Sequence, residues 1–248
     1  MALKIDVFPC LTDNYGFLVT DEASGLTAAI DSPEPTAIIR RVKDLGLPGL
    51  PLLLNTHWHP DHAGGNAALK DHFGCVIWGP EEARQTGPVD HILSGGETFQ
   101  LGETALDIIP LPGHTPGQIG YHDRVGHNAF IGDTLFTLGC GKVWDTMDHM
   151  WQSLLKLAAM PGDTRLFHAH EYTLTNLRFA ESVGGDDALT GRGAALKAMR
   201  ERGEATVPTT VAEELATNPF LVYPLREDGF DAQTARFAEL RRAKDVFK

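Results

Sequence analysis

Residues 56–62 read Thr56-His57-Trp58-His59-Pro60-Asp61-His62 and carry four side chains able to bind a metal ion within six positions. Pro60 keeps His59 out of the helical region, and alternate side chains of an extended segment face the same way. We therefore expect His57 and His59 to point toward one place, and Asp61 and His62, beyond the bend at Pro60, toward a neighbouring place. Imidazole and carboxylate groups suit zinc, iron or manganese, so this segment predicts a metal site.

Four side chains cannot complete the coordination of two ions, so we expect further ligands downstream. His114 lies in a glycine-flanked loop, Asp133 follows an apolar segment, and His168 and His170 lie at the end of another. These are positions beyond strand ends, where α/β proteins place their sites. The residues alone leave both His168 and His170 open, because alternation would place them on the same face. The other histidines are expected to be surface or core residues: His72, His91, His122, His127 and His149.

The order of predicted elements gives the fold class. Up to about residue 170, strands and helices mix, as in an α/β or α+β protein; after Tyr172 only helices are predicted. We therefore expect a domain of mixed strands and helices at 1–170 and a helical domain at 171–248. The predicted strands are Leu3–Phe8, Gly16–Thr20, Leu26–Ile30, Leu50–Asn55, Val76–Gly79, Thr98–Leu101, Leu106–Pro110, Ile119–Asp123, Asn128–Gly132 and Arg165–His168. The predicted helices are Pro35–Leu45, Gly64–Phe73, Met147–Met160, Asn176–Val183, Leu189–Arg202, Val211–Ala216 and Asp231–Phe247.

Composition excludes several classes of protein. The net charge of −12 over 248 residues argues against a protein that binds nucleic acid without sequence preference. Three widely spaced cysteines argue against a disulfide framework. No apolar run approaches the roughly 20 residues of a membrane span, and residues 1–6 contain an acidic group where a signal peptide is apolar. A cytoplasmic protein is expected.

The His57-x-His59-x-Asp61-His62 run resembles the signature of the metallo-β-lactamase superfamily. Other segments resemble one branch of it, the glyoxalase II or hydroxyacylglutathione hydrolase family. The resemblance implies a four-layer αββα sandwich followed by a helical substrate-binding domain. It rests on Asp13-Asn14-Tyr15, Thr56 to Gly65, Pro112 to Gly117, Gly132 to Phe136, Gly139-Cys140-Gly141-Lys142, His170 to Thr173, Pro208-Thr209-Thr210, Glu213-Glu214, Asn218-Pro219-Phe220 and Arg241 to Asp245.

The same resemblance implies a ligand set. One metal ion would bind His57, His59 and His114, the other would bind Asp61, His62 and His170, and Asp133 would bridge them. This selects His170 over His168 and gives Asp61 and Asp133 catalytic roles beside a hydroxide that bridges the ions. Asp31 is a candidate partner that orients a ligand histidine.

The resemblance also implies a glutathione site, formed by Lys142, Trp144, Tyr172, Arg241 and Lys244. Residues 231–248 hold five basic and three acidic side chains, so this end could attract a carboxylate. Two positions depart from the family pattern: Trp144 stands where a tyrosine is common, and Val222 stands where an arginine is usual. They affect the substrate pocket and leave the metal ligands unchanged.

The implied activity is hydrolysis of the thioester S-D-lactoylglutathione to D-lactate and glutathione, the second step of methylglyoxal detoxification. The expected cofactors are two divalent ions, zinc ahead of iron or manganese, and the expected protein is a monomer acting on a small molecule without nucleic-acid or membrane partners. Three alternatives stay open. These are another thioesterase or lactonase of the superfamily, a glutathione persulfide dioxygenase with one iron, and a non-catalytic metal-binding protein.

Overall fold

The computed structural model describes residues 3–247, so Met1, Ala2 and Lys248 of the predicted terminal segments lie outside it. The chain forms two compact units. The first holds the described residues up to Leu111 together with Gly117–Gly132, and the second holds Pro112–Pro116 and the residues from Asp133 onward. These units divide the chain at other points than residue 170, and the division into 1–170 and 171–248 stays a prediction.

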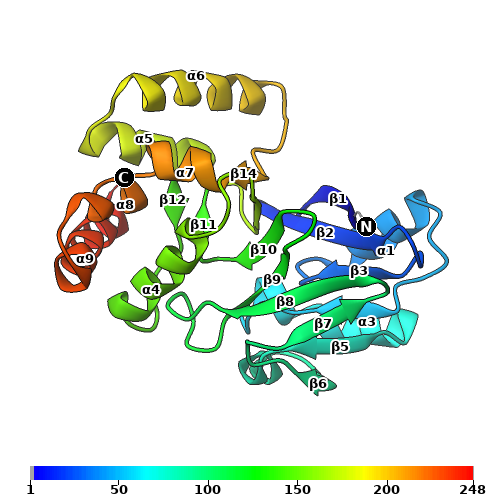
Figure 1. The fold of residues 1–248 in the computed structure, drawn as a ribbon. Coiled ribbons are helices and arrows are strands. Elements are labelled where there is room, and N and C mark those ends of the chain that lie inside the picture. The colour runs from blue at the N-terminus through cyan, green and yellow to red at the C-terminus, as the bar shows by residue number, and fades with distance from the viewer. Residues whose placement is uncertain (1–2, 248) are drawn as a thin grey trace. The chain divides into compact units, whose positions relative to one another are not determined.

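The first unit contains a six-stranded sheet in the order β1-β2-β3-β4-β5-β6 (Figure 1). The first three strands pair antiparallel, and the pairs from β3 onward are parallel. The apolar run predicted as a buried strand becomes β4, whose last two residues are fully buried. The strands are β1 (Leu3–Cys10), β2 (Asn14–Asp21), β3 (Thr27–Ile30), β4 (Leu52–Leu54), β5 (Val76–Gly79) and β6 (His91–Ile92).

The same unit contributes four antiparallel strands to a second sheet, in the order β10-β9-β8-β7. The two sheets pack face to face: the rings of Phe17 and Phe130 lie 5.8 Å apart, and the Tyr121 hydroxyl donates to the Asn55 carbonyl at 2.6 Å. The aromatic contacts therefore close a core between the sheets. These strands are β7 (Thr98–Leu101), β8 (Thr104–Pro110), β9 (Ile119–Asp123) and β10 (Asn128–Gly132).

Helices cover the other face of the first sheet. Ile38 and Val42 of α1 and Leu69 of α3 pack with Leu18 and Leu53 in one buried cluster. The apolar spacing that predicted α1 supplies these contacts. The helical segments of this unit are α1 (Pro35–Asp44), α2 (Pro60–Ala63), α3 (Asn66–Phe73) and the 3₁₀ segment η1 (Glu81–Gln85).

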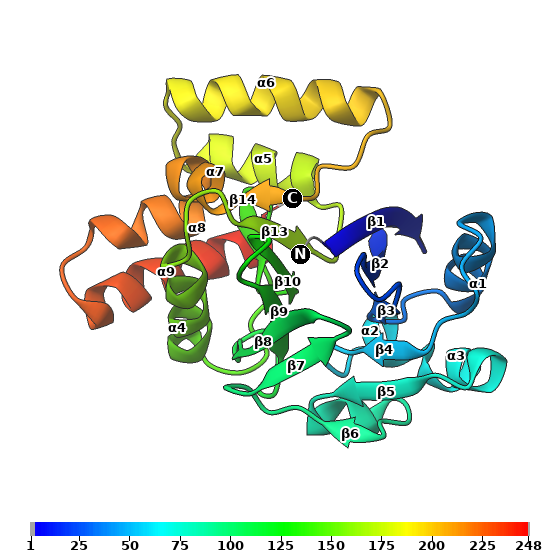
Figure 2. The ribbon, with the colours of Figure 1, turned by 45° about the vertical axis from the view of Figure 1, so that its right-hand side comes forward.

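The second unit is mainly helical, and Figure 2 shows α5 and α6 side by side. Leu177 and Ala180 of α5 share a buried cluster with Leu189 and Leu196 of α6. Its helical segments are α4 (Met147–Ala158), α5 (Thr173–Val183), α6 (Asp187–Glu201), α7 (Val211–Thr217), α8 (Pro219–Val222), η2 (Pro224–Arg226) and α9 (Phe230–Val246). Its strands are β11 (Leu135–Phe136) paired with β12 (Gly139–Cys140), and β13 (Arg165–His168) paired with β14 (Thr209–Thr210).

The structure contains several short elements that we did not predict: α2, α8, β6, β11, β12, β14 and the two 3₁₀ segments. Residues 60–63 form the short helix α2, where we expected only a bend, because Pro60 occupies the first helical position, where its missing N–H has no cost. The part predicted as purely helical contains β14, whose two residues gain strand structure only by pairing with β13. Within residues 3–247, no helix combines the length and apolar composition needed to cross a bilayer.

Candidate metal centre

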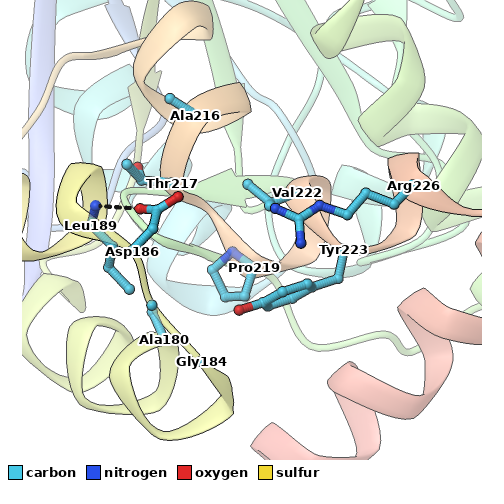
Figure 3. A pocket seen from close by; sticks show the side chains of 11 residues that line it. Ala180, Gly184, Asp186, Leu189, Ala216, Thr217, Pro219, Val222, Tyr223 and Arg226 are labelled. Carbon is cyan, nitrogen blue, oxygen red and sulfur yellow. Dashed lines mark hydrogen bonds between the residues drawn. The ribbon is translucent and has the colours of Figure 1, made fainter.

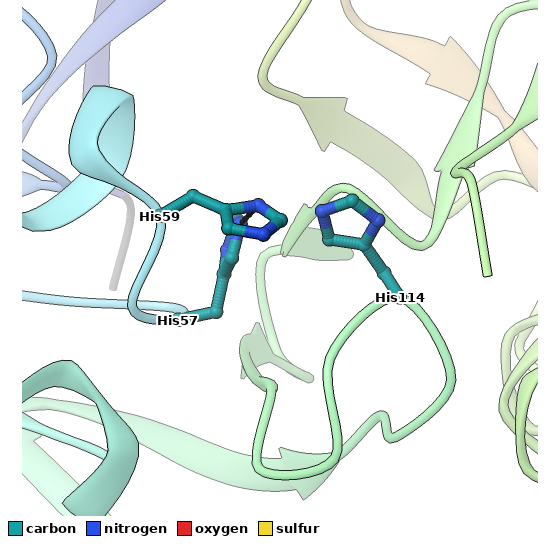
Figure 4. Close-up of side chains that lie close together, drawn as sticks. All are labelled: His57, His59 and His114. Atoms are coloured by element: carbon teal, nitrogen blue, oxygen red, sulfur yellow. Dashed lines mark hydrogen bonds between the residues drawn. The ribbon is translucent and has the colours of Figure 1, made fainter. Parts of the chain in front are cut away.

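The His57–His62 segment runs from the end of β4 into α2. His59 caps α2 with an extended backbone, as expected for a residue before proline. His57 Nε2 and His59 Nδ1 lie 3.0 Å apart, which confirms the prediction that these two rings point toward one place. Figure 4 shows both rings extending from this one segment.

Asp61 and His62 lie in the first turn of α2. Asp61 Oδ2 is 3.5 Å from His62 Nε2, and the ring of His62 lies 3.9 Å from that of His57, centroid to centroid. Asn14 Nδ2 donates to Asp61 Oδ2 at 3.0 Å and fixes the carboxylate. Three imidazoles and a carboxylate are thus gathered within the first unit, as the motif predicts.

Asp31 fixes the ring orientation of two of these histidines. Its Oδ2 accepts from His62 Nδ1 at 2.8 Å and from the Thr56 hydroxyl at 2.8 Å, and its Oδ1 accepts from the Thr56 amide at 2.7 Å. Since the hydroxyl hydrogen of Thr56 is used on Asp31, Thr56 Oγ accepts from His57 Nδ1 at 3.0 Å. Both rings therefore carry their lone pair on Nε2, the tautomer that a metal ion needs. Asp31 therefore contacts a predicted ligand histidine, as expected from the sequence, and its role at a metal site stays a prediction.

The second unit holds the other three predicted ligands, all buried. Asp133 Oδ2 lies 3.5 Å from His114 Nε2 and 3.3 Å from His170 Nε2. His114 extends from its glycine-flanked loop (Figure 4), and its Nδ1 donates to the Lys142 carbonyl at 2.7 Å. This again leaves the lone pair on Nε2. Asp133 is within reach of both histidines, as a bridging carboxylate requires.

The structure separates His168 from His170. His168 is fully buried, its Nε2 lies 2.8 Å from the Thr137 hydroxyl, and burial lowers its pKa to about 4. It is therefore a neutral core histidine. The His170 ring stacks on Tyr172 at 4.8 Å and turns Nε2 toward Asp133. These contacts favour His170 as the ligand.

The predicted substrate residues lie in the second unit and differ in exposure. The Lys142 ammonium sits 4.6 Å over the ring of Trp144, which is 62% exposed, and Tyr172 is 38% exposed. Arg241 is only 6% exposed and donates to the Cys140 carbonyl and to Asp245. Lys244 donates to the Thr175 carbonyl, and burial, with the charges of Arg241 and Arg178, lowers its pKa to about 8.

Three supporting groups escaped the sequence analysis. Asn14 holds Asp61, the Thr56 hydroxyl holds His57, and the Lys142 main chain holds His114. Asn14 belongs to a segment used only for the family resemblance, and Thr56 adjoins the motif, so the sequence could have pointed to both as supporting residues. The Lys142 carbonyl could not have been found in this way, because every residue type carries a main-chain carbonyl.

A separate pocket of about 110 Å³ lies in the helical region (Figure 3). Asp186 enters it from the start of α6, where one oxygen accepts from the Leu189 amide. It contains none of the predicted site residues and does not bear on the metal centre. Its lining is Ala180, Gly184, Gly185, Asp186, Leu189, Ala216, Thr217, Pro219, Val222, Tyr223 and Arg226.

Comparison with known proteins places the chain in a family. The model of the metallo-beta-lactamase superfamily matches residues 28–170, and that of the hydroxyacylglutathione hydrolase C-terminus matches residues 171–247. A hydroxyacylglutathione hydrolase of Erythrobacter litoralis (strain HTCC2594) is 42% identical over 255 residues, which cover 99% of this chain and 100% of that protein. One from Rhizobium meliloti (strain 1021) is also 42% identical and covers 99% of each chain. This chain belongs to the hydroxyacylglutathione hydrolase family.

Solved structures agree with this membership at the level of the fold. ETHE1 from Myxococcus xanthus matches with a TM-score of 0.70 at 20% identity, over 100% of this chain and 96% of that chain. TTHA1623 in a di-iron-bound form matches with a TM-score of 0.62 at 23% identity, over 88% and 100%. The predicted metallo-β-lactamase fold with a helical C-terminal region is confirmed, and the His and Asp clusters of this member of the hydroxyacylglutathione hydrolase family suggest a site for divalent metal ions.

Proposed function

We propose that this chain hydrolyses S-D-lactoylglutathione to D-lactate and glutathione as a metal-dependent thioester hydrolase. The observation that carries the proposal is the donor set. His57, His62 and His114 each use Nδ1 as a hydrogen-bond donor, which leaves Nε2 to bind a cation. Full-length similarity to proteins named hydroxyacylglutathione hydrolase supplies the substrate class.

The proposed ligand assignment follows from the chemistry of the donors. Three groups of these side chains could each hold a metal ion: His57 with His59 and His114, His57 with His62 and Asp133, and Asp61 with His62 and His170. We assign the first group to one ion and the third to the other, with Asp133 between them. Nitrogen and carboxylate donors accept zinc, iron or manganese, and we propose zinc as the native pair.

When bound, the two ions would lower the pKa of a water molecule to near neutrality and polarise the thioester carbonyl. The chain's own residues keep the donors in place. Asp31 and Thr56 hold two histidine rings, Asn14 holds the Asp61 carboxylate, and the Lys142 carbonyl holds His114. The leaving thiolate is a weak base, so the reaction needs little general-acid help, consistent with assigning no side chain that role.

Lys142, Trp144, Tyr172, Arg241 and Lys244 are proposed to hold the glutathione part of the substrate. Glutathione carries two carboxylates and two amides, which ammonium and guanidinium groups recognise by charge-assisted hydrogen bonds. Exposed Trp144 can stack on the substrate but offers no hydroxyl, so we expect it to contribute packing only. Val222, which stands where an arginine is usual in the family, supplies no positive charge for the glutathione carboxylates.

We further propose a monomeric cytoplasmic enzyme with a small-molecule substrate and no nucleic-acid or membrane partner. Cys10, Cys75 and Cys140 are buried free thiols, which suits a reducing compartment. The proposed domains, residues 1–170 for the metal site and 171–248 for substrate binding, are supported by family matches that meet between residues 170 and 171.

The test is hydrolysis of S-D-lactoylglutathione, followed as loss of thioester absorbance beside elemental analysis of the same sample. We expect about two ions per chain and turnover that falls by orders of magnitude in His59→Ala, with the circular dichroism of the fold kept. The exposed His72→Ala serves as a control and should match the parent. Parent-like turnover by His59→Ala contradicts the proposal. One iron per chain with oxygen uptake on glutathione persulfide would favour the dioxygenase, and a metal-loaded protein inert toward all thioesters would favour a non-catalytic role.

A further inference from the structure

The turn of the β11–β12 hairpin is held by side chains from the helical region. Asn176 donates to the Thr137 carbonyl at 3.1 Å, and Glu214 accepts from the Leu138 amide at 3.0 Å. Asn218 donates to the carbonyls of Phe136 and Gly139 at 3.3 and 2.9 Å, and Arg241 donates to that of Cys140 at 2.9 Å. Every residue from 136 to 140 thus has a main-chain group bound to a side chain of α5, of α7, of α9 or of Asn218, which joins α7 to α8.

This hairpin needs such support because its backbone is strained. Leu138 has a φ of +59°, a left-handed conformation that a branched side chain disfavours. Gly139 lets the chain pass close to α5, since a Cβ there would lie 2.4 Å from Asn176 Nδ2. The helical side chains therefore hold a conformation that the segment would not keep by itself.

The supporting side chains are themselves buried and linked. Arg192 of α6 donates to Glu214 and to the hydroxyls of Thr209 and Thr217. Asn218 Nδ2 also donates to Glu214 Oε2 at 2.7 Å. Since Glu214 and Asn218 are fully buried, this network fixes their position firmly.

The hairpin is followed in the chain by Lys142, whose main chain is hydrogen-bonded to the predicted metal ligand His114. The Gly141 amide donates to the Thr134 carbonyl at 3.2 Å, and the next residue, Lys142, offers the carbonyl that accepts from His114 Nδ1 at 2.7 Å. The position of residue 142 therefore bears on the orientation of the His114 ring through this hydrogen bond. Asp133, at the other end of the same segment, lies 3.5 Å from His114 Nε2.

We propose that Asn218 and Asn176 are positioning residues for His114: by holding the β11–β12 turn they place the Lys142 carbonyl that fixes the orientation and tautomer of that ring. The helical region then acts on the metal centre as well as on the substrate. This inference rests on the proposed function in that it takes His114 as a metal ligand.

The test compares Asn176→Ala and Asn218→Ala with Leu196→Ala. The control removes buried apolar volume from the cluster that Leu196 shares with Leu138 of the turn, but it removes no hydrogen bond to the hairpin, so it separates apolar packing on the turn from the hydrogen bonds of the two asparagines. Zinc affinity is measured by chelator competition on the full chain, and the His114 tautomer by ¹⁵N NMR of histidine-labelled, zinc-loaded protein. We expect each asparagine variant to lose about tenfold in zinc affinity, the size of effect known for groups that orient metal ligands. We also expect altered His114 ring nitrogen shifts, with neither change in Leu196→Ala.

Unchanged zinc affinity and unchanged His114 shifts in Asn176→Ala overturn the proposal, as does an equal loss of affinity in Leu196→Ala. Asn218 also caps α8 by accepting from the Phe220 amide, so its variant carries a second defect. Asn176→Ala removes a single hydrogen-bond donor to the hairpin. If Asn218→Ala does not fold, the zinc affinity and the His114 shifts of Asn176→Ala test the proposal. Neither readout needs turnover, so a parent protein inert toward the thioester would end the proposed function and leave this test intact.

Discussion

Nδ1 of His62 lies 2.8 Å from Oδ2 of Asp31, and both side chains are buried. The two residues are 31 positions apart, yet the Thr56 hydroxyl binds the same carboxylate oxygen, so one acidic group orients two histidine rings. A carboxylate behind a histidine makes the ring a better ligand and fixes which nitrogen faces the metal.

Replacing Asp31 should therefore weaken the metal centre. In Asp31→Asn an amide N–H₂ group faces either His62 or Thr56, and we expect metal affinity to fall by about 10- to 100-fold. Asp123→Asn is the matched control. Asp123 is buried like Asp31 and likewise accepts from a main-chain amide, and its other donor is the Asn128 side chain, which is not a predicted metal ligand. Chelator competition measures both variants, and equal affinities in the two would contradict the role of Asp31.

Binding of the glutathione group should weaken in alkaline solution through Lys244. Its pKa is lowered to about 8 by burial and by neighbouring Arg241 and Arg178, so it is charged below that pH and neutral above it. A hydrogen bond to a charged group contributes about 1.5 kcal/mol, so Kd should rise by about tenfold as the pH passes through 8. S-methylglutathione, which has no thiol to titrate, is the ligand for calorimetry.

The comparison variant for this experiment is Lys244→Gln. It should bind weakly at every pH and lose most of the change between pH 7 and pH 9. A parent and a variant whose pH profiles run parallel would remove Lys244 from the substrate site.

Gly141 should not tolerate a side chain. A Cβ there would lie 1.9 Å from the Asp133 carbonyl oxygen and 3.2 Å from His114 Nδ1, and a main-chain atom cannot turn aside. We expect Gly141→Ala to lose about 1–3 kcal/mol of unfolding free energy and most of its bound metal. Gly162→Ala, whose nearest neighbour would be at an ordinary 3.4 Å, should keep both. Urea unfolding and elemental analysis measure the pair, and a metal-replete Gly141→Ala would refute the expectation.

Asp21 should make the fold sensitive to acid. Hydrogen bonds from Ser24 and Thr104, and from the Glu103 amide, hold the pKa of this buried carboxyl well below its usual range. A group whose folded pKa is lowered stabilises the fold above its unfolded pKa, near 4, and loses that contribution as the pH falls. The unfolding free energy of the parent should drop between pH 5 and pH 3, and Asp21→Asn should start lower and drop less. Urea unfolding measures both proteins. A difference in unfolding free energy that stays constant over this pH range would contradict the role of Asp21.

Local chemistry made much of the site predictable. His57 and His59 point the same way because an extended, proline-restrained segment leaves alternate side chains little choice. The apolar run at β4 marked a buried strand for a similar reason, since its residues have no polar face to offer solvent. The helix α2 was missed because the same Pro60 that restrains His59 also suits a first helical position.

Residue spacing alone did not distinguish His168 from His170; the family resemblance selected His170, and the folded chain supplies the physical reason. His168 is the last residue of β13 and His170 lies two positions further on, so sequence periodicity treats them alike. The Thr137 hydroxyl holds the ring of His168 in the core, while the ring of His170 stacks on Tyr172 and turns toward Asp133. The strand β14 needed β13 as a partner, and the carbonyl that fixes His114 belongs to a residue 28 positions away. The sequence by itself determined the donor types and their local aim, because backbone restrictions act between neighbours. Only the folded chain decided the tautomer of each histidine ring and the group that holds its Nδ1. These depend on hydrogen bonds between segments that lie far apart in the sequence.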